Sequence, residues 1–348
     1  MNIIDYVQNN LKTFKESAFK EVDALVLSQF CYIKLKGMVP EEGIKLKDLY
    51  NRSLFDRMFL STRTPLLNRE LLSSMASSSR YRECVIKYHK DIVNKELQFS
   101  ATTFCFDDFV YVAFRGTDGT IVGWQEDFAL SFMSPIPSQR EAYNYLKMVV
   151  SKEDKDIYVG GHSKGGNLAI YASLKCSDCD KIKKIFSNDG PGFPESITDS
   201  EEYKKIEDKI YKTIPTSSFI GLLLDTSNHY RIIKSNKAGI MQHDPFSWVV
   251  KNNSFVYVDK LSSDAVFASR VINRWLSNMD NKKRALFVDT LFDIFNSSNE
   301  DTFGDISRNF MKTVPMMIKA SQNLDKKTKE EFNNLILELA KAPFMGEK

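Results

Sequence analysis

The chain has 348 residues, of which 43% are hydrophobic and 27% are charged, and this balance is ordinary for a globular protein with a substantial core. Its net charge of +3 gives no strong attraction to nucleic acid, and no stretch reaches the roughly 20 apolar residues of a membrane span. The start of the chain, from Met1 to Tyr6, lacks the pattern of a secretory signal, so we expect a cytoplasmic protein.

The first 80 residues favour helices. Ala24, Leu27 and Cys31 share one helical face, because they are spaced three and four residues apart. A second apolar group follows Pro65 and ends before a serine-rich break at residues 77–79. We therefore expect a helical N-terminal segment ahead of the remaining fold.

From Tyr81 the sequence alternates between strand and helix patterns. The run 109–114 is apolar enough for a strand that is buried on both faces. Such alternation predicts an α/β fold with a mostly parallel sheet and right-handed crossovers. Further strands are expected at 84–88, 97–104, 156–159, 184–187, 209–214 and 230–234, and helices at 140–150 and directly after the glycine cluster at 160–166.

After about residue 261 the pattern becomes helical again. Phe267, Val271 and Trp275 repeat every four residues, and Thr328 with Glu331 forms a capping box. We expect two parts: a main domain at 1–260, which includes the helical segment 1–80, and a helical extension or lid at 261–348.

The glycine cluster surrounds Ser163, and Gly161, Ser163 and Gly165 fit the pattern Gly-x-Ser-x-Gly. In this motif a serine nucleophile lies on a sharp, strained turn between a strand and a helix, and the residues two before and two after it must be small. The positive end of the following helix points at the site, where negative charge develops in the transition state. Ser163 is therefore the predicted nucleophile.

The strand at 109–114 ends in the segment Arg115-Gly116-Thr117. In folds with this serine motif, the loop after the third strand supplies one N–H group of the oxyanion hole, and the residue after the nucleophile supplies the other. We expect the backbone N–H groups of Thr117 and Lys164 in these positions. Arg115 is expected to anchor the loop through a salt bridge, for which Asp127 is a candidate partner.

These two segments resemble the class 3 lipases in residues 113–117, Trp124, Asp127 and 161–169. Together with 188–193 and 242–245, they make the chain similar to a bacterial family of lipase-3-like proteins called Mbeg-like, over roughly residues 20–250. The resemblance implies an α/β-hydrolase fold, with helices flanking a mostly parallel central sheet, and esterase or lipase chemistry. It implies no particular substrate.

The histidine of a catalytic triad in this fold follows the serine and the acid along the chain. His89 and His162 precede Ser163, and His162 is expected to pack into the core beside the serine turn. His243 lies beyond the last predicted strand in a loop with turn-forming residues, whereas His229 precedes that strand. We therefore favour His243 as the general base.

The acid that orients this histidine has two candidates. In the class 3 lipases an aspartate follows the second strand after the serine, but the matching stretch here, 215–220, holds no carboxylate. Asp189 ends the preceding strand in a setting that resembles the acid position of pancreatic-type lipases, and Asp225 lies in the next loop. Either loop can reach the histidine, and we favour Asp189, with Asp225 as the alternative.

Lys164 is a second departure, because class 3 lipases usually have an apolar residue after the serine. A lysine here could attract an anionic substrate or lie along the helix surface. Together the motifs predict hydrolysis of a small-molecule or lipid carboxylic ester through an acyl-enzyme on Ser163, without a metal or cofactor. The alternatives are an acyltransferase with the same triad and a non-catalytic interaction protein on a hydrolase scaffold.

Overall fold

The structure is a computed structural model of residues 1–348. It describes residues 1–60, 62–94, 97–117, 135–177, 179–225, 229–263, 265–267, 269–270, 273, 326, 329–330 and 333. Trp124 and Asp127 lie outside the described residues, and so does most of the helical extension that we expect from residue 261. Within the described residues, no helix has both the length and the hydrophobicity to cross a membrane.

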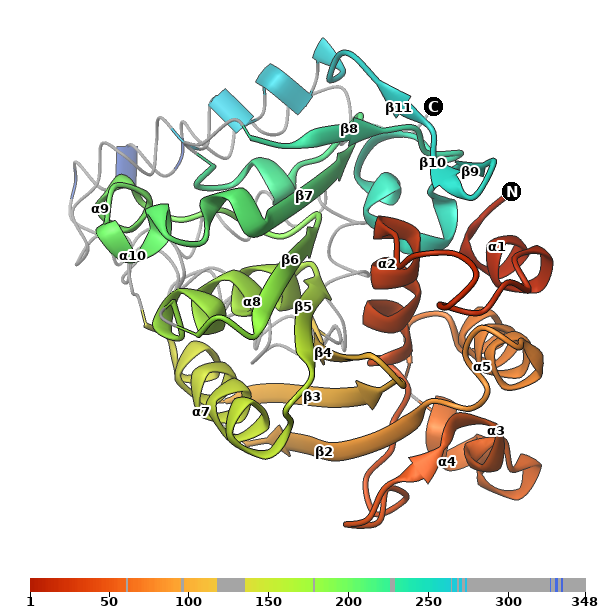
Figure 1. Ribbon diagram of the computed structural model, residues 1–348. Helices are drawn as coiled ribbons and strands as arrows, with labels where there is room; N and C mark the ends of the chain where they lie inside the picture. Colours follow the sequence, from red (N-terminus) through yellow and green to blue (C-terminus); the bar gives the residue numbers. More distant parts are fainter. Residues whose placement is uncertain are drawn as a thin grey trace.

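A nine-stranded sheet lies at the centre of the described chain, in the order β1-β2-β3-β4-β5-β6-β7-β8-β11 (Figure 1). The four pairs between β4 and β8 are parallel, and the other four pairs are antiparallel. The sheet is therefore mixed, and the prediction of a mostly parallel sheet was wrong for its first strands. Only residues 106–108 separate β3 from β4, and a parallel crossover needs a dozen residues or more. The strands are β1 Ile44–Lys45, β2 Val85–Val93, β3 Gln98–Cys105, β4 Phe109–Phe114, β5 Asp156–His162, β6 Ile182–Asn188, β7 Ile210–Pro215, β8 Arg231–Ile233 and β11 Tyr257–Val258.

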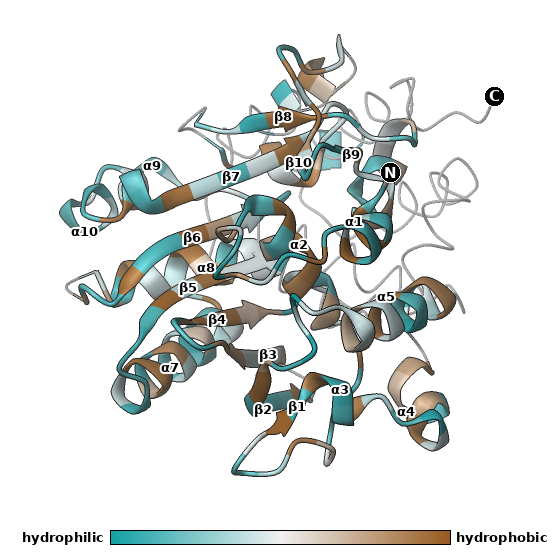
Figure 2. Cartoon of the chain, turned by 45° about the vertical axis from the view of Figure 1, so that its right-hand side comes forward, coloured by the Kyte–Doolittle hydropathy of each residue, from teal (hydrophilic) through white to brown (hydrophobic). Residues whose placement is uncertain are grey.

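The helices between the parallel strands cover one face of the sheet. Strands β4 to β8 are neighbours in both sequence and space, so crossovers of one hand place their helices on the same side. Helices α7 (Pro137–Lys152) and α8 (Lys164–Lys175) form this layer, and α7 shows both polar and apolar stretches (Figures 1 and 2). From β4, Val110 and Val112 pack into this layer. All six residues of β4 are buried, as predicted.

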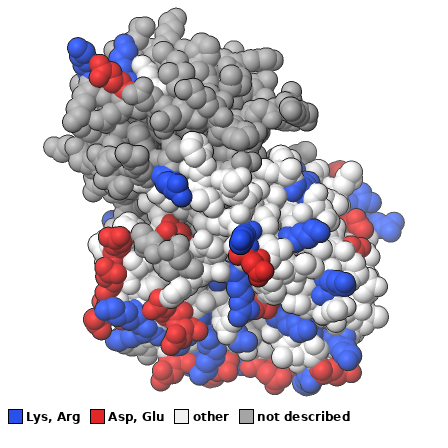
Figure 3. Space-filling view, turned by 90° about the horizontal axis from the view of Figure 1, so that it is seen from above, with Lys and Arg blue, Asp and Glu red and all other residues white. Residues whose placement is uncertain are grey.

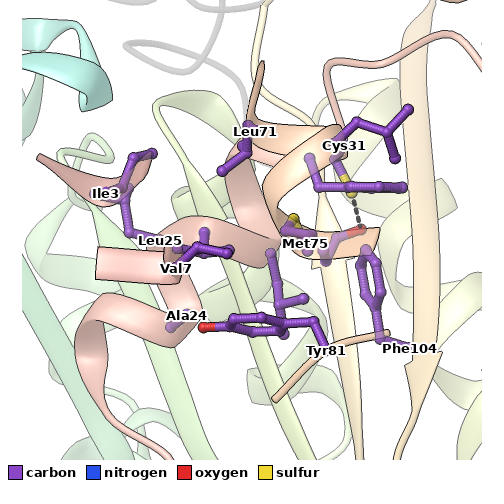
Figure 4. Close-up of a cluster of buried hydrophobic side chains, with 14 of the residues drawn as sticks. Ile3, Val7, Ala24, Leu25, Cys31, Leu71, Met75, Tyr81 and Phe104 are labelled. Carbon is purple, nitrogen blue, oxygen red and sulfur yellow. Dashed lines mark hydrogen bonds between the residues drawn. The ribbon is translucent and has the colours of Figure 1, made fainter. Parts of the chain in front are cut away.

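The helical N-terminal segment covers the opposite face of the sheet. Its main helices are α1 (Ile3–Asn9), α2 (Glu21–Phe30) and α5 (Pro65–Ser77), which lie across the sheet from α7 and α8 (Figure 1). Apolar side chains from these helices point toward one another and toward Phe104 of β3 (Figure 4). Tyr111 of β4 also belongs to this core, because alternate residues of a strand point to opposite faces.

A buried ion pair ties the N-terminal segment together. The carboxylate of Asp23 accepts hydrogen bonds from Arg80 at 2.8 and 2.7 Å, and both side chains are fully buried. The hydroxyl groups of Tyr6 and Tyr81 donate to the same carboxylate. The guanidinium of Arg80 lies over the Phe14 ring, 3.9 Å from its centroid. Both carboxylate oxygens of Asp23 therefore accept hydrogen bonds inside the core.

Short elements complete the described chain. The helices are α3 Leu46–Leu49, α4 Phe55–Phe59, α9 Glu195–Thr198 and α10 Glu201–Lys204, with 3-10 helices at Arg52–Leu54, Glu207–Lys209, Ile220–Leu222, Gly239–His243 and Pro245–Ser247, and a separate hairpin of β9 Val250–Lys251 and β10 Ser254–Phe255. On the face seen in Figure 3, acidic and basic side chains of the described residues are interspersed. The described residues of that face therefore form no extended patch of one charge.

Candidate active site

Ser163 lies on the turn between β5 and α8, at the carboxyl end of a central strand. Its backbone has φ 58° and ψ −133°, which is strained for a residue with a side chain. A Cβ atom on Gly161 would collide with the backbone of Gly165, and one on Gly165 would collide with the carbonyl of Phe114. The structure thus forms the predicted strand-turn-helix geometry, and it explains why both flanking positions are glycine.

A cavity opens at this turn, and Ser163, His243 and Thr117 all line it. Within the described residues, no hydrogen bond joins the Ser163 hydroxyl to His243. Hydrogen bonds between catalytic groups are often long without substrate and become short only in the reacting complex. The structure therefore brings the predicted nucleophile and base to one cavity, with no hydrogen bond between them.

His243 is bound to Asp189. Its Nδ1–H donates to Oδ2 of Asp189 at 2.6 Å, and the aspartate side chain is 1% exposed. Since Nδ1 carries the proton in this bond, Nε2 of the neutral ring has a free lone pair that can accept a proton. Of the two aspartates left open by the sequence, the structure places Asp189 against the histidine.

Asp189 is held by groups that the sequence reasoning missed. Its Oδ1 accepts hydrogen bonds from the Ser218 hydroxyl and, at 3.2 Å, from the Gly221 backbone N–H. Both donors lie in the stretch after β7, where the class 3 lipases have their aspartate. This stretch therefore supplies hydrogen-bond donors to the carboxylate instead of the carboxylate itself.

The other sequence candidates lie elsewhere. Asp225 forms an ion pair with Lys212 at 2.6 Å, and both side chains are at least 95% buried. His229 contacts Glu207 at 3.3 Å, with 74% of its side chain exposed. Neither residue lines the cavity of Ser163. Asp225 is thus already neutralised by a cation, and His229 is a surface residue.

Two buried rings fix the backbone of the His243 loop. Nε2–H of His162 donates to the carbonyl of His243 at 2.9 Å, and the indole N–H of Trp248 donates to the carbonyl of Gln242 at 2.8 Å. Nδ1 of His162 accepts from the Tyr32 hydroxyl at 3.1 Å. Burial, followed by the nearby charge of His243, lowers the pKa of His162 well below its usual value. His162 is therefore a neutral, buried positioning residue, in agreement with the predicted packing into the core.

The loop after β4 lies directly against the serine turn. A Cβ atom on Gly116 would be 3.0 Å from the Cβ of Ser163, so no side chain fits between them. Thr117 follows and lines the cavity, as the predicted oxyanion role requires. Arg115 donates two hydrogen bonds to Asp91 of β2, at 3.2 and 3.0 Å. The candidate partner Asp127 lies outside the described residues, and Asp91 is an anchor that the sequence reasoning did not identify.

The side chain of Lys164 is neither on the helix surface nor in the cavity. It is fully buried, and its ammonium donates to the backbone carbonyl and the side-chain oxygen of Gln98 on β3, at 3.1 and 2.9 Å. Both expectations for this side chain were therefore wrong. Its backbone N–H is a separate feature, because Lys164 is the first residue of α8 and directly follows Ser163.

Comparison with known proteins gives a family and several distant structures. The model of the Mbeg1-like family matches residues 75–293. No curated protein matches the chain. Among solved structures, a Rhizomucor miehei lipase propeptide complex is 15% identical, with TM-score 0.34, over 45% of this chain and 58% of that chain. The chain thus spans a little over half the length of that protein.

Two further solved structures are similarly distant. A mutant form of MDLA from Penicillium cyclopium is 13% identical, with TM-score 0.41, over 68% of this chain and 83% of that chain. Lipase II from Rhizopus niveus is 11% identical, with TM-score 0.38, over 62% of this chain and 78% of that chain.

Proposed function

This chain belongs to the Mbeg1-like family, and from that premise we propose that it is a serine hydrolase that cleaves carboxylic esters through an acyl-enzyme on Ser163. The observation that supports the proposal best is the 2.6 Å hydrogen bond from His243 to the buried Asp189, at a cavity that Ser163 also lines. A buried carboxylate behind an imidazole favours the tautomer that can accept a proton, and it stabilises the imidazolium that forms.

The proposed reaction has two steps that share one set of residues. The Ser163 oxygen attacks the ester carbonyl carbon, and Nε2 of His243 takes its proton and returns it to the leaving alcohol. The backbone N–H groups of Thr117 and Lys164 donate to the oxyanion of each tetrahedral intermediate. Water then attacks the acyl carbon and gives a proton to His243, which passes it to the Ser163 oxygen as the bond between this oxygen and the acyl group breaks. Acid and alcohol are the products.

The two alternatives differ in what now supports them. The non-catalytic hypothesis rested on the missing carboxylate at 215–220, and the contact between Asp189 and His243 removes that reason. An acyltransferase would use the same residues, with an alcohol or amine in place of water. No feature of the described cavity favours such an acceptor, so hydrolysis is the function we propose.

Hydrolysis of short p-nitrophenyl esters tests this function. We expect turnover by the wild-type protein and, in Ser163→Ala, a loss on the order of a million-fold in kcat. Mass spectrometry of the intact protein during turnover should show an acyl adduct on Ser163. Equal rates in the wild type and Ser163→Ala would exclude the assignment.

A further inference from the structure

Arg63 lines the same cavity as Ser163 and His243. We propose that Arg63 binds a negatively charged group of the substrate, a carboxylate or a phosphate, so that the preferred substrates are anionic esters. This inference rests on the proposed ester hydrolysis and assigns its substrate class.

Most residues of the described cavity lining are of polar types. Beyond the residues already discussed, it consists of Gln29, Lys34, Thr62, Arg63, Thr64, Asn68, Asp244 and Pro245. Pockets for small molecules are mostly lined by apolar and aromatic side chains, with a few polar groups that fix orientation. Within the described lining, Pro245 is the single aliphatic residue. Side chains of this kind can form hydrogen bonds with a substrate, and the apolar part of the accessible cavity surface is larger than the polar part.

One positive charge of the described lining has no acidic partner among the described residues. Asp244 is the one carboxylate of this lining among the described residues, and Lys237 neutralises it at 2.6 Å. Arg63 is exposed, and no hydrogen bond or ion pair joins its guanidinium to another described residue. An arginine without an ion pair beside a nucleophile is suited to bind a carboxylate or phosphate through two parallel hydrogen bonds.

Two further features make the electrostatic potential of the cavity more positive. Arg63 precedes Thr64, the N-cap of α5, and the first turn of this 13-residue helix holds no acidic residue. The positive end of the helix dipole therefore adds to the charge of Arg63. Burial and His243 are the main causes of the lowered pKa of His162, and Arg63 also contributes, so its charge acts at the serine turn. The Lys164 side chain cannot play this part, because Gln98 holds it inside the core.

Matched ester pairs test the inference. Mono-p-nitrophenyl adipate and p-nitrophenyl hexanoate have acyl chains of equal length and differ by a carboxylate. The p-acetoxybenzoate anion and its methyl ester place the charge on the alcohol side instead. Short-chain phosphatidic acid and the matching diacylglycerol test a lipid phosphate. We expect at least one anionic member to have a kcat/KM roughly ten- to a hundredfold above its neutral partner, and the pair that shows this identifies the source of the anion.

Variants connect this preference to Arg63. Arg63→Gln should abolish it by lowering kcat/KM for the anionic ester alone, while Arg63→Lys should keep part of it. Arg57→Gln is the matched control, since Arg57 is an exposed arginine of α4 outside the cavity lining. The preference of the wild type should also fall with added salt, because an exposed charge is screened.

The results separate the inference from the proposed function. If Ser163→Ala hydrolyses the neutral esters as fast as the wild type, the proposed function fails. If hydrolysis depends on Ser163 but no pair shows a preference for the anion, the function stands and the inference is overturned. A preference that survives in Arg63→Gln would also overturn the assignment to Arg63.

Discussion

Two buried aspartates, Asp23 and Asp189, have similar surroundings and different partners. Both are fully buried, and both accept hydrogen bonds from several groups. The cation beside Asp23 is Arg80, which stays charged at every accessible pH. The partner of Asp189 is the imidazole of His243, which can be neutral or charged.

This difference distinguishes a carboxylate with a structural role from a carboxylate with a proposed catalytic role. The charge of Asp23 is balanced permanently, so its pair holds α2 and the chain around Arg80 in place. The charge of Asp189 becomes fully balanced only when His243 takes up a proton. In the proposed mechanism this happens when Ser163 attacks, and Asp189 then favours the transition state over the resting state.

Among the changes that test this comparison of aspartates, the largest effect on activity is expected at Asp189. Asp189→Asn should lower kcat for ester hydrolysis on the order of ten-thousandfold, because an amide at this position no longer favours the reactive tautomer of His243. Steady-state kinetics, with circular dichroism to verify folding, measure this. Asp225→Asn is the matched control, since Asp225 is also buried but pairs with Lys212. A larger loss of activity per folded molecule in Asp225→Asn than in Asp189→Asn would reverse the assignment.

At Asp23 we expect a loss of stability with little change in activity. Asp23→Asn leaves the Arg80 guanidinium buried without its counter-charge, and it should reduce the free energy of unfolding by about 3 to 5 kcal/mol. Activity per folded molecule should stay near the wild-type value. Urea unfolding measures the change, and Asp107→Asn, at an exposed pair with Lys15, should have little effect. A specific loss of activity in folded Asp23→Asn would contradict the distinction.

A third prediction concerns His89, a half-buried imidazole whose Nδ1 is hydrogen-bonded to the Thr102 hydroxyl. Burial lowers its pKa from 6.5 to about 4 in the folded protein. Below about pH 6.5 the unfolded chain takes up a proton that the folded protein excludes, so the free energy of unfolding falls by up to about 1.4 kcal/mol per pH unit down to about pH 4. His89→Gln should remove this part of the slope. Urea unfolding between about pH 7 and pH 5 tests it, and an unchanged slope would contradict it.

The smallest effect is expected at Lys164. Its ammonium is bound to Gln98 in the core, away from the cavity. Lys164→Met should therefore leave the ratio of kcat/KM for anionic and neutral esters unchanged, while the protein becomes less stable because the Gln98 oxygens lose their donor. A selective loss of activity toward anionic esters would show that the side chain reaches the substrate.

The features that were predictable from the sequence are local. The apolar run of β4 and the glycines around Ser163 depend on residues close together in the chain. Strand-turn-helix geometry needs small residues at fixed spacing, so the motif predicted this geometry directly. The three-residue connection between β3 and β4 was also a usable signal for an antiparallel pair, and it was overlooked.

The features that escaped prediction depend on contacts between distant residues. Asp189 and Asp225 were both plausible acids until the partner of each was known, and Lys212 is 13 residues from Asp225. The burial of Lys164 depends on Gln98, which is 66 residues away on another strand. Ser218 and Gly221 could be identified as donors only after their loop was placed against Asp189. Such pairings follow from the packing of the folded chain, and no short sequence pattern predicts them.

The rate at which a fluorophosphonate probe modifies Ser163 tests the central claim most directly. The probe reacts with a serine whose hydroxyl is activated, and peptide mass spectrometry identifies the modified residue. We predict rapid labelling of Ser163 in the wild type and in Asp225→Asn, and labelling slowed at least about a hundredfold in Asp189→Asn. Folded wild-type protein that is not labelled at Ser163, or Asp189→Asn that is labelled at the wild-type rate, would contradict the account.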